Sequence, residues 1–517
     1  RSATLSIGGI SYQVTQAPPD TTPPTVAIVS PAANFTTSNA TLQVQGTASD
    51  NTAVSRVEYR VGTNAFATAT GTTAWSALVS LVTGTNIVSV RSVDTAGNVS
   101  TEVQRPFVCV TPGTITVTIR GRGSVKGATN GQHLVFGKAY SLSALPDPGY
   151  AFSNWTGTVA GHASRLDFVM MSNVQVTANF VPNPFAACKG AFQGLFYETN
   201  QVQQQRSGYF SLALTDKGSY SASLLTRGWK LKAKGKFDLA GFATNQISAP
   251  DGSTYTVTWS IALDGSDTIS GNVGTGGWAS SLSGDRLVFN AKTNPAPQAG
   301  RYTFVILGTP GQADAPGGDG YGTVTVATKG TATLSGYLAD RTKFVVKRSL
   351  SKFGNSPVYV SLYSGKGAVL GWIAFRDRPT TDLDAVLSWT RPSLAGSLYP
   401  GGFVSESAMI GSLFEAAPGN SPVIDLPNPT IRFEGGNLTA SFTNTLAVAG
   451  GGFSNLGANA LTLKVTPPSG LFRGTVQVPG SSLTLPFNGV VVQKTGVGCG
   501  YFVGTNETGR VTLESAP

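Results

Sequence analysis

Four oxygen-bearing side chains lie at two places where β-strands are expected to end. Asp50 and Asn51 follow the stretch TLQVQGTAS, whereas Asp94 and Asn98 belong to the stretch VDTAGNVS. If both strands end at the same end of one β-sandwich, these carboxylate and amide oxygens can lie close together. Oxygen ligands suit Ca²⁺, so calcium is the one cofactor that the sequence suggests. The other interpretation, which we favour, is that all four residues only form Asx turns with neighbouring backbone.

A second group of residues is basic. The segment RGWKLKAKGKF has a lysine at every second position, and alternate residues of a β-strand lie on one face. A further basic cluster, at residues 343–348, lies near the corresponding place of a second copy of the repeated sequence. Such rows can bind a polyanion, for example an acidic polysaccharide, or can guard an exposed strand edge against aggregation; we favour edge protection. The candidates for polyanion or glycan binding are Lys230, Lys232, Lys234, Lys236, Lys343, Lys347 and Arg348.

The chain has three cysteines, at positions 109, 188 and 499. Their spacing fits no zinc motif, and their odd number leaves at least one thiol free or paired with another chain. Cys188 and Cys499 lie near the first and last strands expected in the C-terminal region. A disulfide between them would tie the ends of that region together in an extracellular setting.

The sequence predicts no catalytic residues. Its two histidines, at 133 and 162, both precede residue 184, so the region after it cannot hold a Ser-His-Asp triad or a Cys-His pair. Paired carboxylates could still serve a glycosidase, and the many basic residues and tyrosines could serve a polysaccharide lyase. The carboxylate pairs considered are Asp264 with Asp267, Asp382 with Asp384, and Glu406 with Glu415. A turn is the simpler role for the first pair.

The elements that must position these residues are β-strands. The 517 residues include 63 glycines and 29 prolines, and short runs of alternating apolar and polar residues recur between turn residues, which indicates an all-β, multidomain chain. Apolar residues make up 40%, enough for packed cores. Since no stretch of about 18 apolar residues occurs, no transmembrane helix is expected. The net charge of +10 favours acidic partners, but no nucleic-acid-binding motif accompanies it.

Residues 1–20 are expected to form a hairpin followed by a linker. Apolar and polar residues alternate on both sides of Gly8-Gly9, and two prolines then end the pattern. The hairpin resembles the C-terminal end of BACON-type immunoglobulin-like modules. That resemblance implies a domain whose earlier strands are absent from this chain, or a hairpin that adds to the sheet of another molecule.

Two small modules follow. Residues 21–112, with ASDN and VDTAGNVS, resemble the bacterial Ig-like modules of secreted and cell-surface proteins, which implies a β-sandwich. Residues 113–183 resemble the divergent internalin-type B repeat through the element Gly149-Tyr150-x-Phe152-x-x-Trp155-x-Gly157. This implies a small β-grasp-like module that acts as a spacer or interaction unit. Phe152 and Trp155 are expected to be core residues.

Residues 184–517 contain an internal repeat. GYFSLALTDKGSYSASL at 208–224 aligns with GYGTVTVATKGTATLSG at 320–336, and a fainter copy lies at 461–476. Repeated hairpins predict barrels or packed sheets, divided at about 184–300, 301–400 and 401–517. GLFYETN, GDGYGTVTV and SPVYVSLYSGKGAVLGWIAF resemble a long C-terminal β domain of modular secreted bacterial proteins. The resemblance implies location more than activity.

The sequence therefore predicts an exported, non-catalytic bacterial protein of the cell surface or extracellular space, with a structural or adhesive role. Its partners would be further copies of itself or envelope components, and an acidic polysaccharide; neither nucleic acid nor a membrane span is expected. A surface filament or matrix assembled by strand addition is one form of that role. The alternatives are a carbohydrate-binding module array of a larger polysaccharide-active enzyme, and a lyase or glycosidase of unknown family.

Overall fold

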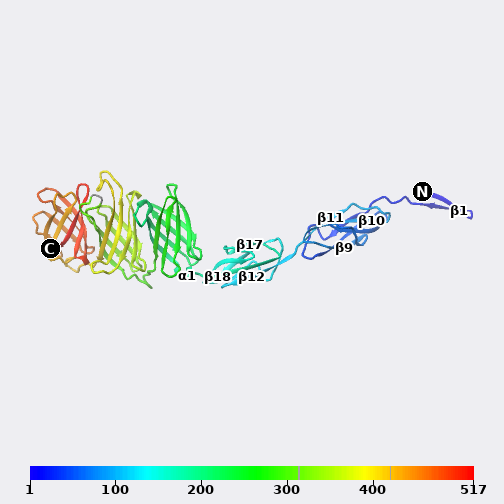
Figure 1. Ribbon diagram of the computed structural model, residues 1–517, viewed down its shortest axis with the longest axis horizontal. Helices are drawn as coiled ribbons and strands as arrows, with labels where there is room; N and C mark the ends of the chain where they lie inside the picture. The colour runs from blue at the N-terminus through cyan, green and yellow to red at the C-terminus, as the bar shows by residue number, and fades with distance from the viewer. Residues whose placement is uncertain (313–314, 420, 517) are drawn as a thin grey trace. The chain divides into compact units, whose positions relative to one another are not determined.

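The computed structural model describes residues 1–312, 315–419 and 421–516 and is built almost wholly from β-strands, as predicted (Figure 1). Two compact units, Arg1–Pro182 and Asn183–Pro517, are described separately below. The helical segments of the described ranges are α1 (Phe185–Cys188), η1 (Gln204–Arg206), η2 (Tyr363–Gly365) and η3 (Gln493–Thr495). Within these ranges, no helix has the length and apolar character needed to cross a membrane.

The first unit begins with an antiparallel hairpin of β1 (Ser2–Ile7) and β2 (Ile10–Thr15), which form a two-stranded sheet of their own. Every residue of both strands is exposed. The register places Leu5 opposite Tyr12 and Ile7 opposite Ile10, so the apolar residues of the two strands share one face. This face is one of the exposed apolar surfaces of the molecule.

An immunoglobulin-like sandwich follows. Its two sheets enclose a core that includes the fully buried Val44, Val88 and Phe107. One sheet has the order β4 (Thr36–Thr37), β11 (Val103–Cys109), β10 (Gly84–Asp94), β6 (Val54–Val61) and β7 (Ala67–Thr68). The other has the order β3 (Thr25–Ser30), β5 (Thr41–Ser49), β9 (Ala74–Ser80) and β8 (Thr70–Gly71).

The next module consists of two small sheets. One has the order β14 (His133–Val135), β12 (Pro112–Arg120), β18 (Asn173–Pro182) and β16 (Tyr150–Gly157); the other has the order β13 (Gly123–Lys126), β15 (Ala139–Pro146) and β17 (Arg165–Val169). β12 and β18 pair in parallel. Trp155 is 1% exposed and packs against Phe152, with ring centroids 5.5 Å apart. The prediction that Trp155 is a core residue is confirmed.

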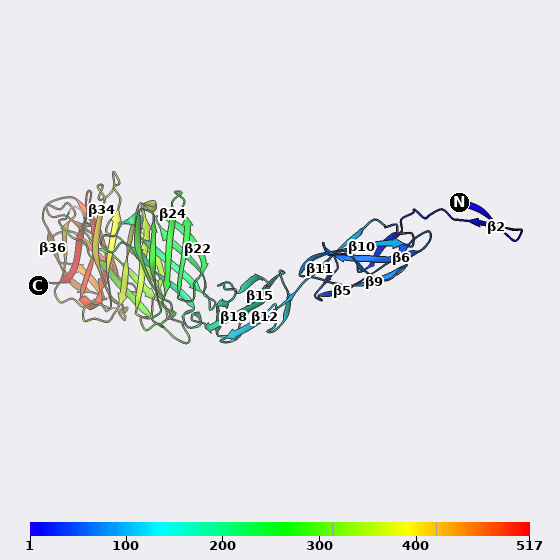
Figure 2. The same cartoon turned by 45° about the vertical axis from the view of Figure 1, so that its right-hand side comes forward.

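The second unit contains three eight-stranded antiparallel sheets, each curled into a barrel (Figures 1 and 2). In every barrel the first strand pairs with the last, and the two strands at the ends of the sheet order lie side by side without a continuous ladder. We call this junction the seam. It lies between β22 and β23, between β30 and β31, and between β37 and β38 in the three barrels.

The strands of the first barrel are β19 (Gly190–Tyr197), β20 (Gly208–Leu214), β21 (Ser219–Thr226), β22 (Trp229–Lys236), β23 (Phe242–Ser248), β24 (Thr254–Ile261), β25 (Thr268–Thr275) and β26 (Trp278–Arg286). Those of the second are β27 (Gly300–Ile306), β28 (Gly320–Val326), β29 (Thr331–Tyr337), β30 (Lys343–Ser349), β31 (Asn355–Leu362), β32 (Gly367–Phe375), β33 (Leu383–Arg391) and β34 (Phe403–Leu413). Those of the third are β35 (Pro429–Gly435), β36 (Phe442–Ala449), β37 (Gly452–Asn455), β38 (Leu461–Thr466), β39 (Leu471–Gln477), β40 (Thr484–Val492), β41 (Val497–Val503) and β42 (Thr508–Ser515).

These bounds correct two details of the sequence interpretation. The repeated hairpins at 208–224 and 320–336 do occupy equivalent places, as β20–β21 and β28–β29, the second and third strands of their barrels. The fainter copy at 461–476 is β38–β39, the fourth and fifth strands of the third barrel, because hairpins of one barrel look alike locally. The second barrel also extends through β34 to Leu413, beyond the boundary expected near residue 400.

Aromatic side chains fill the barrel interiors by lying over glycines of neighbouring strands. A Cβ atom at Gly208 would lie 2.5 Å from the ring of Phe196, and one at Gly322 would lie 2.6 Å from the ring of Phe304. Both phenylalanines are fully buried. The interiors are therefore packed cores in which these glycines make room for a ring.

The three barrels are joined by packed side chains. Between the first and second barrels, the guanidinium of Arg348 lies 3.9 Å from the centroid of the Tyr209 ring, and Lys352 pairs with Asp267 at 2.9 Å. Between the second and third, Arg510 pairs with Asp319 at 3.1 Å. Asp319 is buried and Arg348 is stacked on a ring, so each of these contacts requires a defined arrangement of the two barrels that it joins.

Candidate functional site

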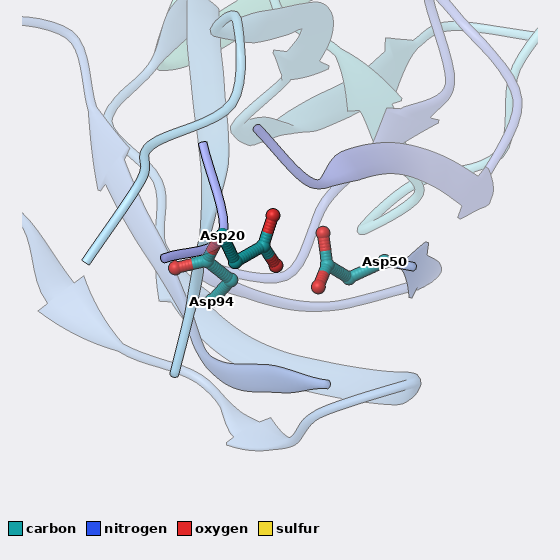
Figure 3. Close-up of side chains that lie close together, drawn as sticks. All are labelled: Asp20, Asp50 and Asp94. Carbon is teal, nitrogen blue, oxygen red and sulfur yellow. The ribbon is translucent and has the colours of Figure 1, made fainter. Parts of the chain in front are cut away.

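Three aspartates meet in the immunoglobulin-like module. Asp50 follows β5 directly, Asp94 is the last residue of β10, and Asp20 belongs to the segment before β3. One oxygen from each carboxylate lies within 4.8 Å of the others, and Figure 3 shows the three side chains gathered at this place. Ends of two strands and the preceding segment therefore supply the candidate metal centre.

Asp94 is the most buried of the three, with 2% of its surface exposed. Its Oδ1 accepts hydrogen bonds from the backbone of Ala96 (2.9 Å) and Asn98 (2.8 Å), and its Oδ2 accepts one from Asn98 Nδ2 (2.7 Å). Burial raises the pKa of Asp94, but the hydrogen bonds from Asn98 and the following backbone outweigh it, so the pKa lies below its ordinary value. The carboxylate is therefore ionised at neutral pH.

Asp20 is held by three donors. The backbone of Thr22 (3.0 Å) and Asn51 Nδ2 (3.2 Å) donate to its Oδ1, and Thr52 Oγ1 donates to its Oδ2 at 2.8 Å. The hydrogen bond from the Thr22 backbone, followed by those from Thr52 and Asn51, lowers the pKa of Asp20. Every one of these donors is neutral, so none compensates the negative charge.

Only one carboxylate oxygen of Asp50 accepts hydrogen bonds from the described residues. Its Oδ2 accepts hydrogen bonds from the backbone of Thr52 (2.8 Å) and Ala53 (3.1 Å). Its Oδ1 is buried and has no hydrogen-bond partner among the described residues. Such an atom is costly to bury without a partner, and a bound cation would supply one.

The structure corrects the roles expected for the two asparagines. Asn51 and Asn98 were expected to offer oxygen ligands. Instead, Asn51 Nδ2 donates to Asp20, and Asn98 Nδ2 donates both to Asp94 and to the Asp20 carbonyl oxygen at 3.0 Å. They hold the carboxylates in place, because an amide beside a carboxylate is stabilised when its NH₂ faces the negative oxygen.

The arrangement fits calcium. Oxygen ligands bind Ca²⁺ at about 2.3–2.6 Å, so two ligands of one ion can be no farther apart than about 5 Å, and the three carboxylate oxygens satisfy that limit. Asp50, Asp94 and the newly found Asp20 would be the ligands. The Asx turns weighed as the alternative are also present, since Asp50 and Asp94 accept hydrogen bonds from following backbone.

Sequence reasoning missed Asp20. It lies 30 residues before Asp50, in the proline-rich stretch APPDTTPP, where no strand pattern connects it with the sandwich. The signal that could have found it is a lone carboxylate between two proline pairs that enters the domain.

The lysine row of β22 is arranged as predicted. Lys230, Lys232, Lys234 and Lys236 are all exposed and alternate with buried Leu231 and Ala233. In β30 of the second barrel, Lys343 and Lys347 are likewise exposed.

Arg348 corrects the candidate list. Its guanidinium stacks on Tyr209 of the first barrel and donates to the Tyr359 carbonyl oxygen at 3.1 Å. Burial lowers its pKa. Arg348 therefore joins two barrels and the β30–β31 seam, and is not placed for binding a polyanion.

The structure contradicts the expected disulfide between Cys188 and Cys499. All three cysteines are free thiols. Cys188 belongs to the core of the first barrel, whereas Cys499 packs where the second and third barrels meet. All strands of the first two barrels lie between them in the sequence. Burial raises the pKa of Cys499 to about 12.

Three of the six carboxylates considered for a glycosidase form ion pairs with basic side chains. Asp267 pairs with Arg286 and Lys352, Asp382 with Lys494, and Asp384 with Arg376 and Arg378. Burial raises the pKa of Asp267, but Lys352 and Arg286 bring it below its ordinary value. A catalytic acid needs the opposite shift.

Comparison with known families matches two parts of the chain. Residues 24–119 match the bacterial Ig domain, and residues 113–184 match the divergent InlB B-repeat domain. The chain therefore contains both modules, and these domains indicate a surface or extracellular protein. No curated protein matches the chain.

Solved structures with some similarity include transferrin-binding protein B of Haemophilus parasuis, at 9% identity over 76% of this chain and 85% of that one, with a TM-score of 0.17. An endo-1,5-alpha-L-arabinanase of Thermotoga petrophila has 8% identity over 57% and 96%, with a TM-score of 0.16. The sialic acid binding region of a Streptococcus sanguinis adhesin has 12% identity over 71% and 96%, with a TM-score of 0.14. Scores this low carry no functional argument.

Proposed function

We propose that this protein is a non-catalytic structural or adhesive component of the bacterial surface or extracellular space. The observation that carries the proposal is the packing of the three barrels. Their interiors are filled by apolar side chains such as Phe210, Trp259 and Phe304, and buried contacts lock neighbouring barrels together. Such a body suits a rigid scaffold whose outer walls make the contacts. The two preceding modules belong to families typical of surface proteins.

Calcium is the proposed structural cofactor of the immunoglobulin-like module. Bound between Asp20, Asp50 and Asp94, it would tie the segment before β3 to the ends of β5 and β10. Calcium titration of the full chain should give one saturable event, and 10 mM Ca²⁺ should raise the first thermal transition by at least about 5 °C, for an affinity typical of extracellular modules. Mg²⁺ should have a smaller effect.

The control for this experiment is a carboxylate outside the cluster. Asp50→Asn should abolish the calcium response, because it removes one negative charge. The amide oxygen would still accept from the Thr52 and Ala53 backbone, so an NH₂ group would take the place of the buried Oδ1. Asp167→Asn changes an exposed carboxylate of the next module and should leave the response intact. A calcium response that persists in Asp50→Asn would refute the site.

The hairpin is the proposed joint between copies. One of its faces carries Leu5, Ile7, Ile10, Tyr12 and Val14, each more than half exposed. An isolated two-stranded hairpin is marginally stable in water. Strands of a second copy that add to its edge would extend the sheet and bring their own apolar side chains beside this face.

Negative-stain microscopy and light scattering of the full chain test this joint. Filaments or discrete oligomers are expected, and deletion of residues 1–17 should convert them to monomers. The double variant Leu5→Ser/Tyr12→Ser should do the same, whereas Thr4→Ser/Gln13→Ser on the opposite face should not. A monomeric full chain, or polymers that persist without the hairpin, would exclude the hairpin as the joint.

A further inference from the structure

The outer wall of the first barrel carries a groove beside the lysine row of β22. The groove has a volume of about 380 Å³ and is lined by residues of β19, β20, β21 and β22 and by Leu287. Lys230, Lys232 and Lys234 all line it, together with Tyr209 and small residues of the neighbouring strands. The positive charges therefore stand along a recess in the wall.

Strand register explains the recess. Lys234 lies opposite Ser221, which lies opposite Ala213; Lys232 lies opposite Ser223, which lies opposite Ser211. In each of these two rows of directly opposed residues, a lysine of β22 is followed by small side chains on β21 and β20. Small residues in the middle of a wall, next to long ones at its side, leave a trough.

The far end of the trough is closed by larger groups. In the next row, Lys230 lies opposite Leu225, which lies opposite Tyr209. Leu225 and Tyr209 pack against a buried cluster that includes Tyr359 of the second barrel, and Arg348 stacks on the Tyr209 ring. The second barrel therefore limits the groove at this end.

Edge protection does not account for the lysine row. A lysine row guards an edge whose backbone groups face solvent, but the free edge of β22 faces β23 across the seam. Asn245 of β23 donates to the Lys234 carbonyl oxygen at 3.0 Å and so bridges the two strands. The edge is already covered by its own barrel.

The groove contains unmatched polar groups. The ion pairs of the first barrel, among the described residues, involve none of the three lysines; they are Arg206 with Glu198, Arg227 with Asp251, Arg286 with Asp267, and Lys352 with Asp267. The hydroxyl of Ser223, directly opposite Lys232, is buried and has no hydrogen-bond partner in the described part of the chain. Cations and a hydroxyl without partners suit a ligand that brings negative oxygens.

We propose that this groove binds a strand of an acidic polysaccharide. Alternate residues of one strand stand about 7 Å apart, so the three lysines form a line that matches an extended polymer with repeated carboxylates or sulfates. A single-stranded nucleic acid would need exposed rings on which its bases stack. Of the two aromatic residues that line the groove, Tyr209 already carries Arg348 and Phe192 is only 1% exposed. The groove proposal adds a class of ligand to the adhesive role proposed above. It rests on that role only because an acidic polysaccharide would be met outside the cell.

The test compares binding of the full chain to polygalacturonate, dextran sulfate and neutral dextran. The first two polymers separate carboxylates from sulfate esters as the recognised group. We expect saturable, salt-sensitive binding to at least one acidic polymer and none to neutral dextran. Lys230→Gln/Lys232→Gln/Lys234→Gln should weaken it about tenfold or more, if each exposed contact contributes as a surface ion pair does.

Two further variants separate the groove from net charge. Lys343→Gln/Lys347→Gln removes two exposed charges from the second barrel and should change the affinity less than about twofold. Ser221→Trp fills the trough without changing any charge and should weaken binding as strongly as the triple variant. Thermal unfolding curves that match the unmodified chain show that each variant is folded.

Several results would overturn the proposal. They are the absence of binding to both acidic polymers, equal losses in the triple variant and the Lys343/Lys347 control, or full binding by Ser221→Trp. Tighter binding of single-stranded DNA through the same lysines would reassign the ligand. Residues 1–17 are unchanged in all these variants, so the assembly proposal and the groove proposal fail separately.

Discussion

Replacing Asn245 with alanine should open the seam of the first barrel. Asn245 Nδ2 donates to the Lys234 carbonyl oxygen of β22, and its Oδ1 accepts from Tyr220 Oη at 2.7 Å and Trp259 Nε1 at 2.9 Å. One side chain therefore connects the two strands at the seam with two aromatic residues of the core.

The magnitude follows from what the substitution leaves behind. Tyr220 is 5% exposed and Trp259 is 1% exposed, so each would keep a buried donor without a partner. A buried donor left unpaired costs about 1–3 kcal/mol, whereas the Lys234 carbonyl oxygen at the seam can bind water. For two donors, Asn245→Ala should therefore cost about 2–6 kcal/mol in total.

Hydrogen–deuterium exchange of the full chain measures this locally. Protection of β22 and β23 should fall by roughly a factor of 30 or more in Asn245→Ala, while the third barrel keeps its protection. Gln246→Ala, on the exposed side of the same strand, is the control and should stay within about 0.5 kcal/mol of the unmodified chain. Unchanged protection of β22 and β23, or an equal loss in all three barrels, would refute the reasoning.

Two more predictions concern buried titratable groups. Burial, the largest influence, raises the pKa of Asp319 to about 6 in spite of Arg510, so the native state binds a proton more readily than the unfolded chain. The stabilisation is complete below pH 4 and is lost as the pH rises through 6. Relative to Asp319→Asn, the unmodified chain should lose up to about 3 kcal/mol between pH 4 and pH 7 in urea unfolding, and a flat difference would contradict this. Cys499, with its pKa raised to about 12, should resist iodoacetamide at pH 8 until the protein unfolds, as followed by mass spectrometry; a peptide pair linking Cys188 to Cys499 would show a disulfide instead.

The fold was largely predictable because its signals are local. Alternating patterns identified strands, and the repeat at 208–224 and 320–336 identified equivalent hairpins. The sequence left open whether the hairpins form closed barrels or packed sheets, since closure depends on pairing between first and last strands such as β19 and β26, far apart in the chain. The same limit explains the misplaced copy at 461–476, because a hairpin does not encode its position in a sheet.

The candidate metal centre was predictable only in part. Asp50 and Asp94 stand at strand ends, where the sequence marks them, but Asp20 reaches the cluster from a segment without strand pattern. Asn51 and Asn98 were recognised as members of the cluster and assigned the wrong role, because sequence does not show which amide atom faces a carboxylate. Arg348 was misassigned for a similar reason: charge alone does not reveal that a side chain stacks between barrels.

The two aligned barrels differ at the place where the groove lies, and this difference bears on its role. In the first barrel Ser223 lies opposite Lys232, whereas in the second Ser335 lies opposite Val345, which is 61% exposed. The flanking lysines recur as Lys343 and Lys347. If the row existed only to keep the barrel soluble, the second barrel would need a charge at this central position as much as the first, yet it exposes a valine there. A continuous line of three lysines is therefore a property of the first wall alone among these two barrels, as expected if that wall binds a ligand and the other does not.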